Sequence, residues 1–224
     1  ICLIVIEDHI REDAADTIKW FRDNDVAVKV ISGDNPITVA EVARRVGVEN
    51  ADKYISLEGL SNQEVMEAAS RYTVFGRVTP EQKSILVRSM KSKGHTVAMT
   101  GDGVNDAPSI KSADIGIGMG ITGTDVTKNV ADMVLTDDNF ATIVNAVEEG
   151  RRIYDNIRKA IQFLLGSNLA EVLAIFTATL LGFTILEAPH LLFINLVTDC
   201  FPALALGMEN AEKDIMQRRP RSAK

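Results

Sequence analysis

Hydrophobic and polar positions follow two different patterns along the chain. From residue 1 to residue 150, short apolar runs alternate with segments in which apolar residues recur at helical spacing. The runs predict strands at Cys2–Ile6, Val26–Ile31, Tyr72–Phe75, Val97–Met99, Ile115–Ile117 and Met133–Leu135. The helical spacing predicts helices at Glu12–Asp23, Pro36–Val46 and Pro80–Ser92. This alternation predicts an α/β domain with a mostly parallel sheet and helices on both faces.

Two long apolar segments follow. Ile161–Leu186 has 26 residues and one charge, and Leu191–Met208 has 18 residues and one charge. A membrane-spanning helix needs about 20 mostly apolar residues, which both segments approach or exceed. Basic residues flank the outer ends of the segments but are absent from the short loop between them, so the positive-inside bias predicts a hairpin with both ends cytoplasmic. We expect a helix that begins near Asn139 to run straight into the first span.

Charge and cysteine usage narrow the choice of partners. The formal net charge is −7, which argues against a nucleic-acid or anionic-lipid partner. The average hides an uneven distribution, because residues 1–150 are acidic while residues 161–208 are largely apolar. Cys2 and Cys200 lie in apolar runs without metal-ligand spacing, so we interpret both as reduced structural residues. The chain begins on Ile1 inside an apolar run, and we expect it to be a piece of a longer protein.

Candidate chemistry lies where predicted strands end, because loops at the carboxyl ends of parallel strands carry the functional groups of such sheets. In the loop 32–35, the Ser32 hydroxyl and the Gly33 amide are placed to donate to a phosphoryl oxygen, beside Asp34. Lys83, near the start of a predicted helix, would neutralise developing negative charge. Taken alone, Ser-Gly-Asp is an ordinary turn and a single lysine is an ordinary solvated residue.

The loop Thr100–Asp106 is harder to explain as a turn, since it combines two glycines with two carboxylates and an amide. Carboxylate oxygens suit magnesium, so Asp102 is the candidate Mg²⁺ ligand. Asn105 and Asp106 would hold the loop or contact the phosphate.

Several stretches resemble the P-type ATPases and occur in that family's order. They are Ile31-Ser32-Gly33-Asp34-Asn35, Phe75-Gly76-Arg77-Val78-Thr79-Pro80-Glu81-Gln82-Lys83, Met99-Thr100-Gly101-Asp102-Gly103-Val104-Asn105-Asp106-Ala107-Pro108 and Ala113-Asp114-Ile115-Gly116-Ile117-Gly118-Met119-Gly120. The resemblance runs from about residue 5 to residue 222. It implies a haloacid-dehalogenase-like, Rossmannoid phosphorylation domain that uses ATP and Mg²⁺. By the same resemblance, Asp102 binds Mg²⁺, Lys83 contacts the phosphate, Ser32, Gly33 and Asp34 line the site, and Asn105 and Asp106 support it.

Two departures from the family pattern are visible. Ser32 stands where the family usually has threonine, which keeps the hydroxyl, and Asp8-His9 stands where the family has Asp-Pro. The family's phosphorylated aspartate, in an Asp-Lys-Thr-Gly-Thr motif, does not occur in the 224 residues. The nucleotide-binding and actuator domains and the earlier transmembrane helices are expected elsewhere in the pump, as its partners. Without an attacking carboxylate, we predict that this fragment alone has no ATPase activity.

The resemblance also divides the chain. Residues 1–148 correspond to the carboxyl-terminal part of the phosphorylation domain. Residues 149–208 correspond to a stalk and the fifth and sixth transmembrane helices, at about 161–186 and 191–208, and residues 209–224 to the following cytoplasmic loop. The implied location is integral in a lipid bilayer, with several spans and the phosphorylation domain in the cytoplasm; compact connections favour a bacterial plasma membrane.

Polar residues inside the spans indicate transport. Asn168 and Glu171 share one helix face, and Asn195, Thr198 and Asp199 share a face of the other span. A carboxylate at mid-bilayer costs at least about 2.5 kcal/mol, so each should face a partner, a cavity or an ion. Pro202 has no N–H for the carbonyl of Thr198, which frees an oxygen for a hard cation.

The identity of the ion comes from resemblance. Ser167-Asn168-Leu169-Ala170-Glu171 and Asn195-Leu196-Val197-Thr198-Asp199 resemble the fifth and sixth helices of calcium-transporting P-type ATPases. The leading interpretation is therefore an ATP-driven Ca²⁺ pump that couples aspartyl-phosphate formation and hydrolysis to ion movement. Two alternatives stay open: a P-type pump for Na⁺, H⁺ or Mn²⁺, and a membrane-anchored haloacid-dehalogenase-like phosphatase. Polar side chains that only join buried helices would also give this pattern.

Overall fold

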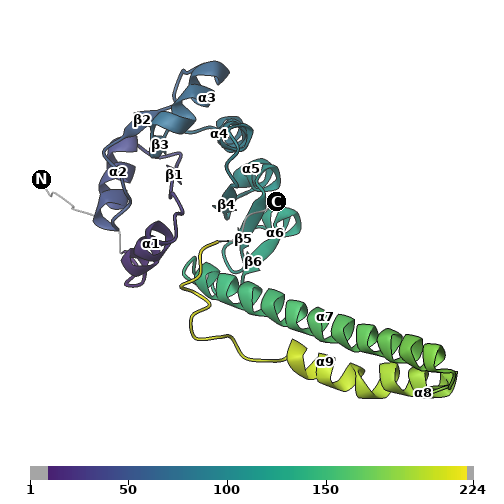
Figure 1. Ribbon diagram of the computed structural model, residues 1–224. Helices are drawn as coiled ribbons and strands as arrows, with labels where there is room; N and C mark the ends of the chain where they lie inside the picture. The colour runs from purple at the N-terminus through teal and green to yellow at the C-terminus, as the bar shows by residue number, and fades with distance from the viewer. Residues whose placement is uncertain (1–9, 221–224) are drawn as a thin grey trace, which may run out of the picture. The chain divides into compact units, whose positions relative to one another are not determined.

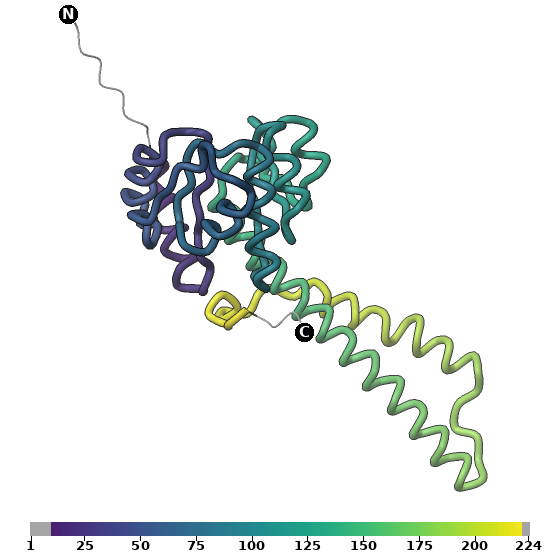
Figure 2. The backbone as a smooth tube through the Cα atoms, turned by 90° about the horizontal axis from the view of Figure 1, so that it is seen from above, coloured from purple at the N-terminus to yellow at the C-terminus, as the bar shows by residue number. Residues whose placement is uncertain are grey.

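The computed structural model describes residues 10–220 of the chain, and these form two compact units. The division falls between Val144 and Asn145, inside a long helix. Figures 1 and 2 show the units as a group of small helices and strands and a helical hairpin. Each unit is described by itself.

The first part of the α/β unit is a three-stranded parallel sheet with helices. Its elements are α1 (Ala14–Asp23), β1 (Val30–Ile31), α2 (Pro36–Arg45), β2 (Tyr54–Ser56), α3 (Asn62–Arg71) and β3 (Val74–Gly76). The strand order is β1-β3-β2, with Val30 opposite Val74 and Ile55 opposite Phe75. All three strands therefore end at the same edge, where loops can meet.

The second part repeats this arrangement. Its elements are α4 (Pro80–Ser92), β4 (Ala98–Gly101), the 3₁₀ turn η1 (Val104–Asp106), α5 (Ala107–Ser112), β5 (Ile115–Met119), α6 (Asp125–Val130) and β6 (Met133–Leu135). The strands are parallel in the order β4-β5-β6. Gly116 lets α5 pack closely, because a Cβ there would lie 2.7 Å from a side-chain carbon of Ile110.

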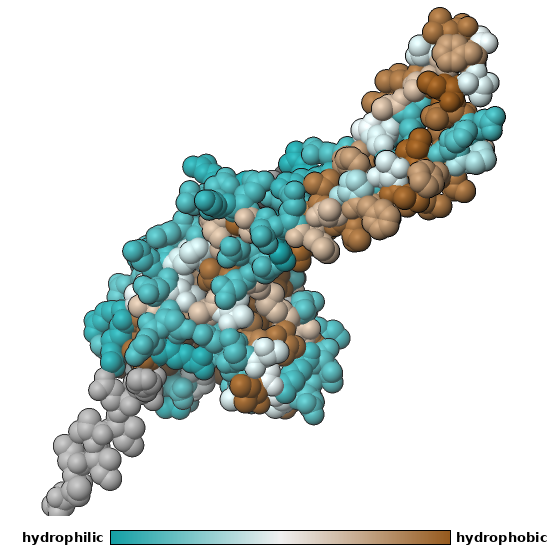
Figure 3. All heavy atoms as spheres, turned by 90° about the horizontal axis from the view of Figure 1, so that it is seen from below, coloured by the Kyte–Doolittle hydropathy of each residue, from teal (hydrophilic) through white to brown (hydrophobic). Residues whose placement is uncertain are grey.

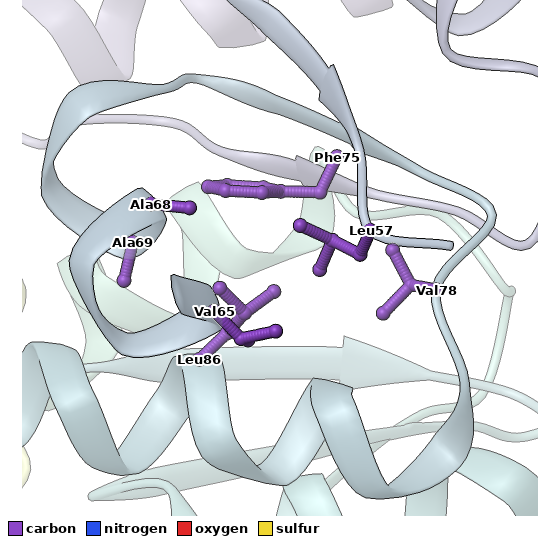
Figure 4. Packing of buried hydrophobic residues seen from close by; sticks show 7 residues of the cluster. All are labelled: Leu57, Val65, Ala68, Ala69, Phe75, Val78 and Leu86. Atoms are coloured by element: carbon purple, nitrogen blue, oxygen red, sulfur yellow. The ribbon is translucent and has the colours of Figure 1, made fainter. Parts of the chain in front are cut away.

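Buried side chains hold the first sheet to its helices. Figure 4 shows one cluster, in which the side chains of Leu57, Val65 and Phe75 point toward one another and are fully buried. Leu86 from α4 joins this cluster, so α4 packs onto the first sheet. A second cluster lies around Val74 on the other face and includes Ala43 of α2. Helices on both faces were predicted, and these clusters confirm them.

The main fold prediction is confirmed and several details are wrong. The strands are parallel, but the described residues form two three-stranded sheets rather than one. The predicted strand Val26–Ile31 is reduced to Val30–Ile31, while the helix predicted at Pro80–Ser92 has those bounds. The elements β2, α3, α5 and α6 were not predicted. The strand predicted at Cys2–Ile6 lies outside the described residues, as do Asp8 and His9.

The second unit is a helical hairpin. Helix α7 (Thr142–Leu181) has 40 residues, and α8 (Ala188–Phe193), the π-helical segment η2 (Ile194–Thr198) and α9 (Cys200–Gly207) form the returning arm. The two arms lie side by side in both views. Both are long and apolar enough to cross a membrane, and Figure 3 shows many hydrophobic side chains on their surface, with hydrophilic ones among them.

The bounds of the spans need correction. Hydropathy placed the end of the first span at Leu186, but α7 ends at Leu181 and Gly182 adopts a positive φ of 80°. A glycine in this left-handed conformation commonly terminates a helix. The second arm begins at Ala188 rather than Leu191, with Pro189 in its first turn. The prediction that one helix runs directly into the first span is confirmed, with its start at Thr142.

A segment after α9 is tied back to α7. The amide of Asn156, which is 3% exposed, donates to the carbonyls of Gly207 at 3.3 Å and Glu209 at 2.7 Å. Lys159 pairs with Glu209 at 2.8 Å. The last carbonyls of a helix have no hydrogen-bond partner within that helix. Asn156, which belongs to α7, therefore caps the end of α9.

Candidate functional site

The loop after β1 has the form expected of a phosphate loop. The Ser32 hydroxyl donates to Asp34 Oδ2 at 3.0 Å and accepts from the Asp34 N–H at 3.1 Å. Asn35 caps α2 by accepting from the N–H of Ile37 at 2.9 Å, with Pro36 in the first turn. A hydroxyl, the Gly33 amide and a helix N-terminus thus meet at the carboxyl end of a parallel strand, where anions bind.

A neighbouring turn fixes this loop. The N–H groups of Arg77 and Val78 donate to the carbonyls of Asp34 at 2.9 Å and Ser32 at 3.1 Å. Arg77 itself has a φ of 52°. The preceding Gly76 has no room for a side chain, because a Cβ would lie 2.5 Å from the Cα of Pro36. The stretch Phe75–Val78 therefore positions the phosphate loop, a role that its sequence did not indicate.

Lys83 and Asp106 form a mostly buried ion pair. The Lys83 ammonium donates to Asp106 Oδ1 at 2.6 Å, and the two side chains are 15% and 11% exposed. Asp106 Oδ2 accepts from the N–H of Gly103 at 3.3 Å. Gly101 is required beside it, because a Cβ there would lie 2.5 Å from the Cβ of Asp106. Asp106 therefore holds both the lysine and the loop, and two further ammonium hydrogens of Lys83 stay available.

The backbone of Asp102 is fixed by hydrogen bonds, while its side chain is exposed. Its carbonyl accepts from the N–H of Thr124 at 3.0 Å and the hydroxyl of Thr127 at 3.3 Å. Thr127 is fully buried, and its role was missed because a threonine inside a short helix gives no signal in the sequence. The Asp102 side chain is exposed and forms no hydrogen bond within residues 10–220, and no such bond involves the exposed side chain of Asn105.

The donor set fits magnesium only as part of a larger site. Among the described residues, no three His, Cys, Asp or Glu side chains lie together as a metal site. Mg²⁺ typically binds through one or two protein carboxylates, phosphate oxygens and water, so a single free carboxylate at Asp102 fits it. No hydrogen bond in the described part of the chain joins the loop of Ser32 to that of Asp102.

The loops that contain Ser32 and Asp102 follow strands with one open edge each. Within the described residues, β1 pairs only with β3 and β4 pairs only with β5. In β4, Ala98 and Thr100 are exposed, which is unusual for a strand of a parallel sheet. Both edges thus have backbone groups that can accept a further strand.

Polar groups also meet in the hairpin. Asn195 Nδ2 donates to Glu171 Oε2 at 3.2 Å, which joins the two spans. Asp199 is 4% exposed, and Asp199 Oδ2 and Glu171 Oε1 are buried without a hydrogen-bond partner in the described chain. Burying a carboxylate oxygen without a partner is costly, so both atoms are candidates for cation binding.

The helix backbone is irregular at this point, just before the turn that contains Pro202. The N–H of Asp199 donates to the carbonyl of Ile194 at 2.9 Å, five residues back, within the π-helical segment η2. Such π-bulges occur frequently at functional sites. Thr198 and Asn168 are exposed and no hydrogen bond ties their side chains to Glu171 or Asp199.

Comparisons with known proteins agree with this geometry. A family model described as haloacid dehalogenase-like hydrolase matches residues 1–114, and one described as cation transporting ATPase, C-terminus, matches residues 183–224. The chain belongs to the haloacid dehalogenase-like hydrolases and is a segment of the P-type ATPase family.

The relatives of this P-type ATPase segment come from several kingdoms. Calcium-transporting ATPase 1 of Bacillus cereus is 45% identical over 99% of the chain and 26% of its own length. The endoplasmic reticulum calcium ATPase srcA of Aspergillus fumigatus is 47% identical over 98% of the chain and 23% of its own length. The chain thus spans about a quarter of the curated relatives it matches. Since these include a fungal protein, a bacterial origin is not established.

A solved structure supports the fold of the P-type ATPase segment. The crystal structure of a zinc-transporting PIB-type ATPase in its E2.Pi state is 30% identical, with a TM-score of 0.62. The match covers 90% of this chain and 27% of that chain. The haloacid-dehalogenase-like fold and the membership in the P-type ATPases, both implied by sequence resemblance, are confirmed.

Proposed function

We propose that this chain is the part of an ATP-driven calcium pump that joins the phosphorylation site to the ion site. The observation that carries the proposal is the pair of buried, unpartnered oxygens Glu171 Oε1 and Asp199 Oδ2. Carboxylates inside a membrane are costly unless a partner or a cation compensates them. The matched relatives are named calcium-transporting ATPases, which favours Ca²⁺ over Na⁺, H⁺ or Mn²⁺.

The transported ion would be held by oxygens from both spans. Glu171 and Asp199 provide the negative charge, and Asn168, Asn195 and Thr198 provide neutral oxygens. Pro202 has no N–H to donate to the carbonyl of Thr198, so this backbone oxygen is a further candidate. Calcium takes six to eight oxygen ligands, and the remaining ones would come from other helices of the pump.

The phosphate half of the cycle requires an aspartate from outside the described residues. The open edges of β1 and β4 can both be satisfied by one inserted parallel strand. A strand that carries the Asp-Lys-Thr-Gly-Thr motif would end between the loop of Ser32 and the loop of Asp102. Its carboxylate would then attack the terminal phosphorus of ATP, which breaks the bond to the bridging oxygen, releases ADP and forms the aspartyl-phosphate.

The residues of this chain would bind and stabilise the transferred group. The Gly33 amide donates to its oxygens, and Ser32 joins it by turning its single hydroxyl hydrogen from Asp34 Oδ2 to the phosphoryl group. Lys83 offers the cation, Asp106 holds the loop in which Asp102 lies, and the exposed side chain of Asn105 would contact the phosphate. Mg²⁺, held by Asp102, would offset the charge on the phosphoryl oxygens when bound.

Helix α7 offers the connection between the two chemical events. It begins at Thr142, shortly after β6 of the phosphorylation domain, and contains Glu171 within the same 40-residue helix. A continuous helix transmits displacement along its axis because each turn is hydrogen-bonded to the next. Movement at the aspartyl-phosphate would therefore be felt at the calcium ligands.

The test is calcium uptake by the full-length pump in sealed vesicles. Glu171→Gln and Asp199→Asn remove one charge each, and we expect the apparent calcium affinity to fall about tenfold or more. Thr179→Val is the matched control in the same span, because the Thr179 hydroxyl only donates to the carbonyl of Ile175 in its own helix. The control should transport like the wild type.

Two outcomes would contradict the proposal in different ways. Phosphoenzyme formation stimulated by Na⁺ and not by Ca²⁺ would keep the pump but exclude calcium. Unchanged ATP turnover in both carboxylate variants would instead indicate a phosphatase for which the hairpin is only a membrane anchor.

A further inference from the structure

A hollow of about 650 Å³ lies between the stalk part of α7 and the segment that follows α9. Both walls belong to the second unit of the chain, and residues 147–158 form one of them. The charged side chains in its lining are four arginines and one aspartate: Arg151, Arg158, Arg218, Arg219 and Asp155. The proposed pump function does not use this hollow.

The hollow has an excess of positive charge once ion pairs are considered. Arg218 is neutralised, since it pairs with Asp155 at 2.7 Å and also with Glu212 and Asp214. Arg151 donates to the carbonyls of Ile215 at 2.8 Å and Arg218 at 3.0 Å, and carbonyl oxygens do not cancel its charge.

Two further guanidinium groups are available for a ligand. Arg158 and Arg219 are exposed, and within residues 10–220 neither forms an ion pair. Guanidinium groups bind phosphate oxygens through two parallel hydrogen bonds, so a pair of them around one hollow suits a phosphate.

The position of the hollow indicates where that phosphate would come from. Arg158 precedes the first residue of the predicted span, Ile161, by three residues, or about 4.5 Å along the helix. The headgroup layer on each side of a bilayer is about 5–7 Å thick, so Arg158 lies at its depth. Tyr154, one turn further out, is a residue type that is enriched at this interface.

We propose that this hollow binds the headgroup of an anionic phospholipid in the cytoplasmic leaflet. The formal charge of −7 argued against such a partner, but it averages over the acidic α/β unit. Locally, three guanidinium groups that form no ion pair among residues 10–220 line a hollow at headgroup level. Basic pockets at the cytoplasmic ends of transmembrane helices are a known way to bind such lipids.

The experiment measures lipid association with the full-length pump and does not depend on transport. The pump is reconstituted in phosphatidylcholine vesicles that contain phosphatidylglycerol, and the preference for spin-labelled phosphatidylglycerol is measured. Arg158→Gln with Arg219→Gln should reduce the preference about fivefold for each arginine removed. Lys213→Gln is the control, since Lys213 is exposed in the same segment but does not line the hollow.

The outcomes of this experiment distinguish a lipid headgroup from a free phosphate anion as the ligand. A preference that soluble glycerol phosphate abolishes at constant ionic strength would overturn the lipid proposal in favour of a free anion. An equal loss in the Lys213→Gln control would overturn it in favour of unspecific surface charge. Because binding is measured directly, failure of the calcium proposal would leave this result unaffected.

Discussion

At the scale of single residues, Lys83 and Asp106 combine a structural role with a proposed chemical one. Their ion pair is mostly buried and ties α4 to the loop after β4. Asp106 also accepts from the N–H of Gly103, so the loop geometry depends on its carboxylate. The two roles can be separated because only one of them needs a positive charge at position 83.

Lys83→Met should leave a buried carboxylate without its counter-charge. Breaking such a pair from one side costs about 3–5 kcal/mol, so thermal unfolding of the full-length pump should occur at lower temperature. In the double variant Lys83→Met with Asp106→Asn, no charge is buried, and much of this stability should return. Phosphoenzyme formation from ATP should not return, because the cation next to the phosphate is still missing. If the double variant recovers both properties, Lys83 is structural and the proposed phosphate contact is wrong.

At the scale of elements, a helix or strand could be predicted where its own residues carried a clear signal, such as a capping residue or an apolar run. Helix α4 was predicted well because Thr79 and Gln82 form a capping box and Pro80 occupies the first turn. Helix α3 has the same signal in Ser61 and Glu64 and was overlooked. The short strand β2 was missed because Ile55 is its one aliphatic residue, between Tyr54 and Ser56, so it does not form an apolar run as β6 does. The end of α7 was misplaced because hydropathy does not distinguish helical from extended apolar residues.

For the candidate site, the sequence motifs named residues whose function stays a prediction. Asp102, Lys83 and Asp106 are brought to one loop region, as the motif implied. The supporting residues were not foreseen, because Thr127 and Asn156 act through tertiary hydrogen bonds to backbone carbonyls. Such partners are distant in sequence and leave no periodic pattern.

Asn156 provides a test of the capping of α9. Asn156→Ala removes the hydrogen bonds to the carbonyl of Gly207, the last residue of α9, and to that of Glu209 just beyond it, and each such bond contributes about 0.5–1.5 kcal/mol. We expect the end of α9 to loosen and the apparent calcium affinity of the pump to fall several-fold, with little change in the maximal rate. Asn145→Ala is the matched control, since Asn145 is exposed on the same helix. Equal calcium dependence in both variants would exclude a positioning role for Asn156.

At the scale of the whole molecule, one continuous helix joins the two chemical sites. Helix α7 has 40 residues, which corresponds to a length of about 60 Å. Its intramembrane part contains Glu171, and its first turn follows the last strand of the phosphorylation domain. Between β6 and Glu171 the chain runs along α7. A change within this helix is therefore the direct way to interrupt the coupling between phosphorylation and calcium binding.

A proline in the stalk should uncouple the two sites without damaging either. Ile153 is 52% exposed, so Ile153→Pro changes little packing but removes the hydrogen bond to the carbonyl four residues back and kinks the helix. We expect the full-length variant to form the phosphoenzyme from ATP whether or not calcium is present, while calcium uptake is lost. Ile153→Ala keeps the helix intact and should retain calcium-dependent phosphorylation. A proline variant that still requires calcium for phosphorylation would mean that the signal reaches the site through other helices, because the hydrogen-bonded path along α7 would then be dispensable.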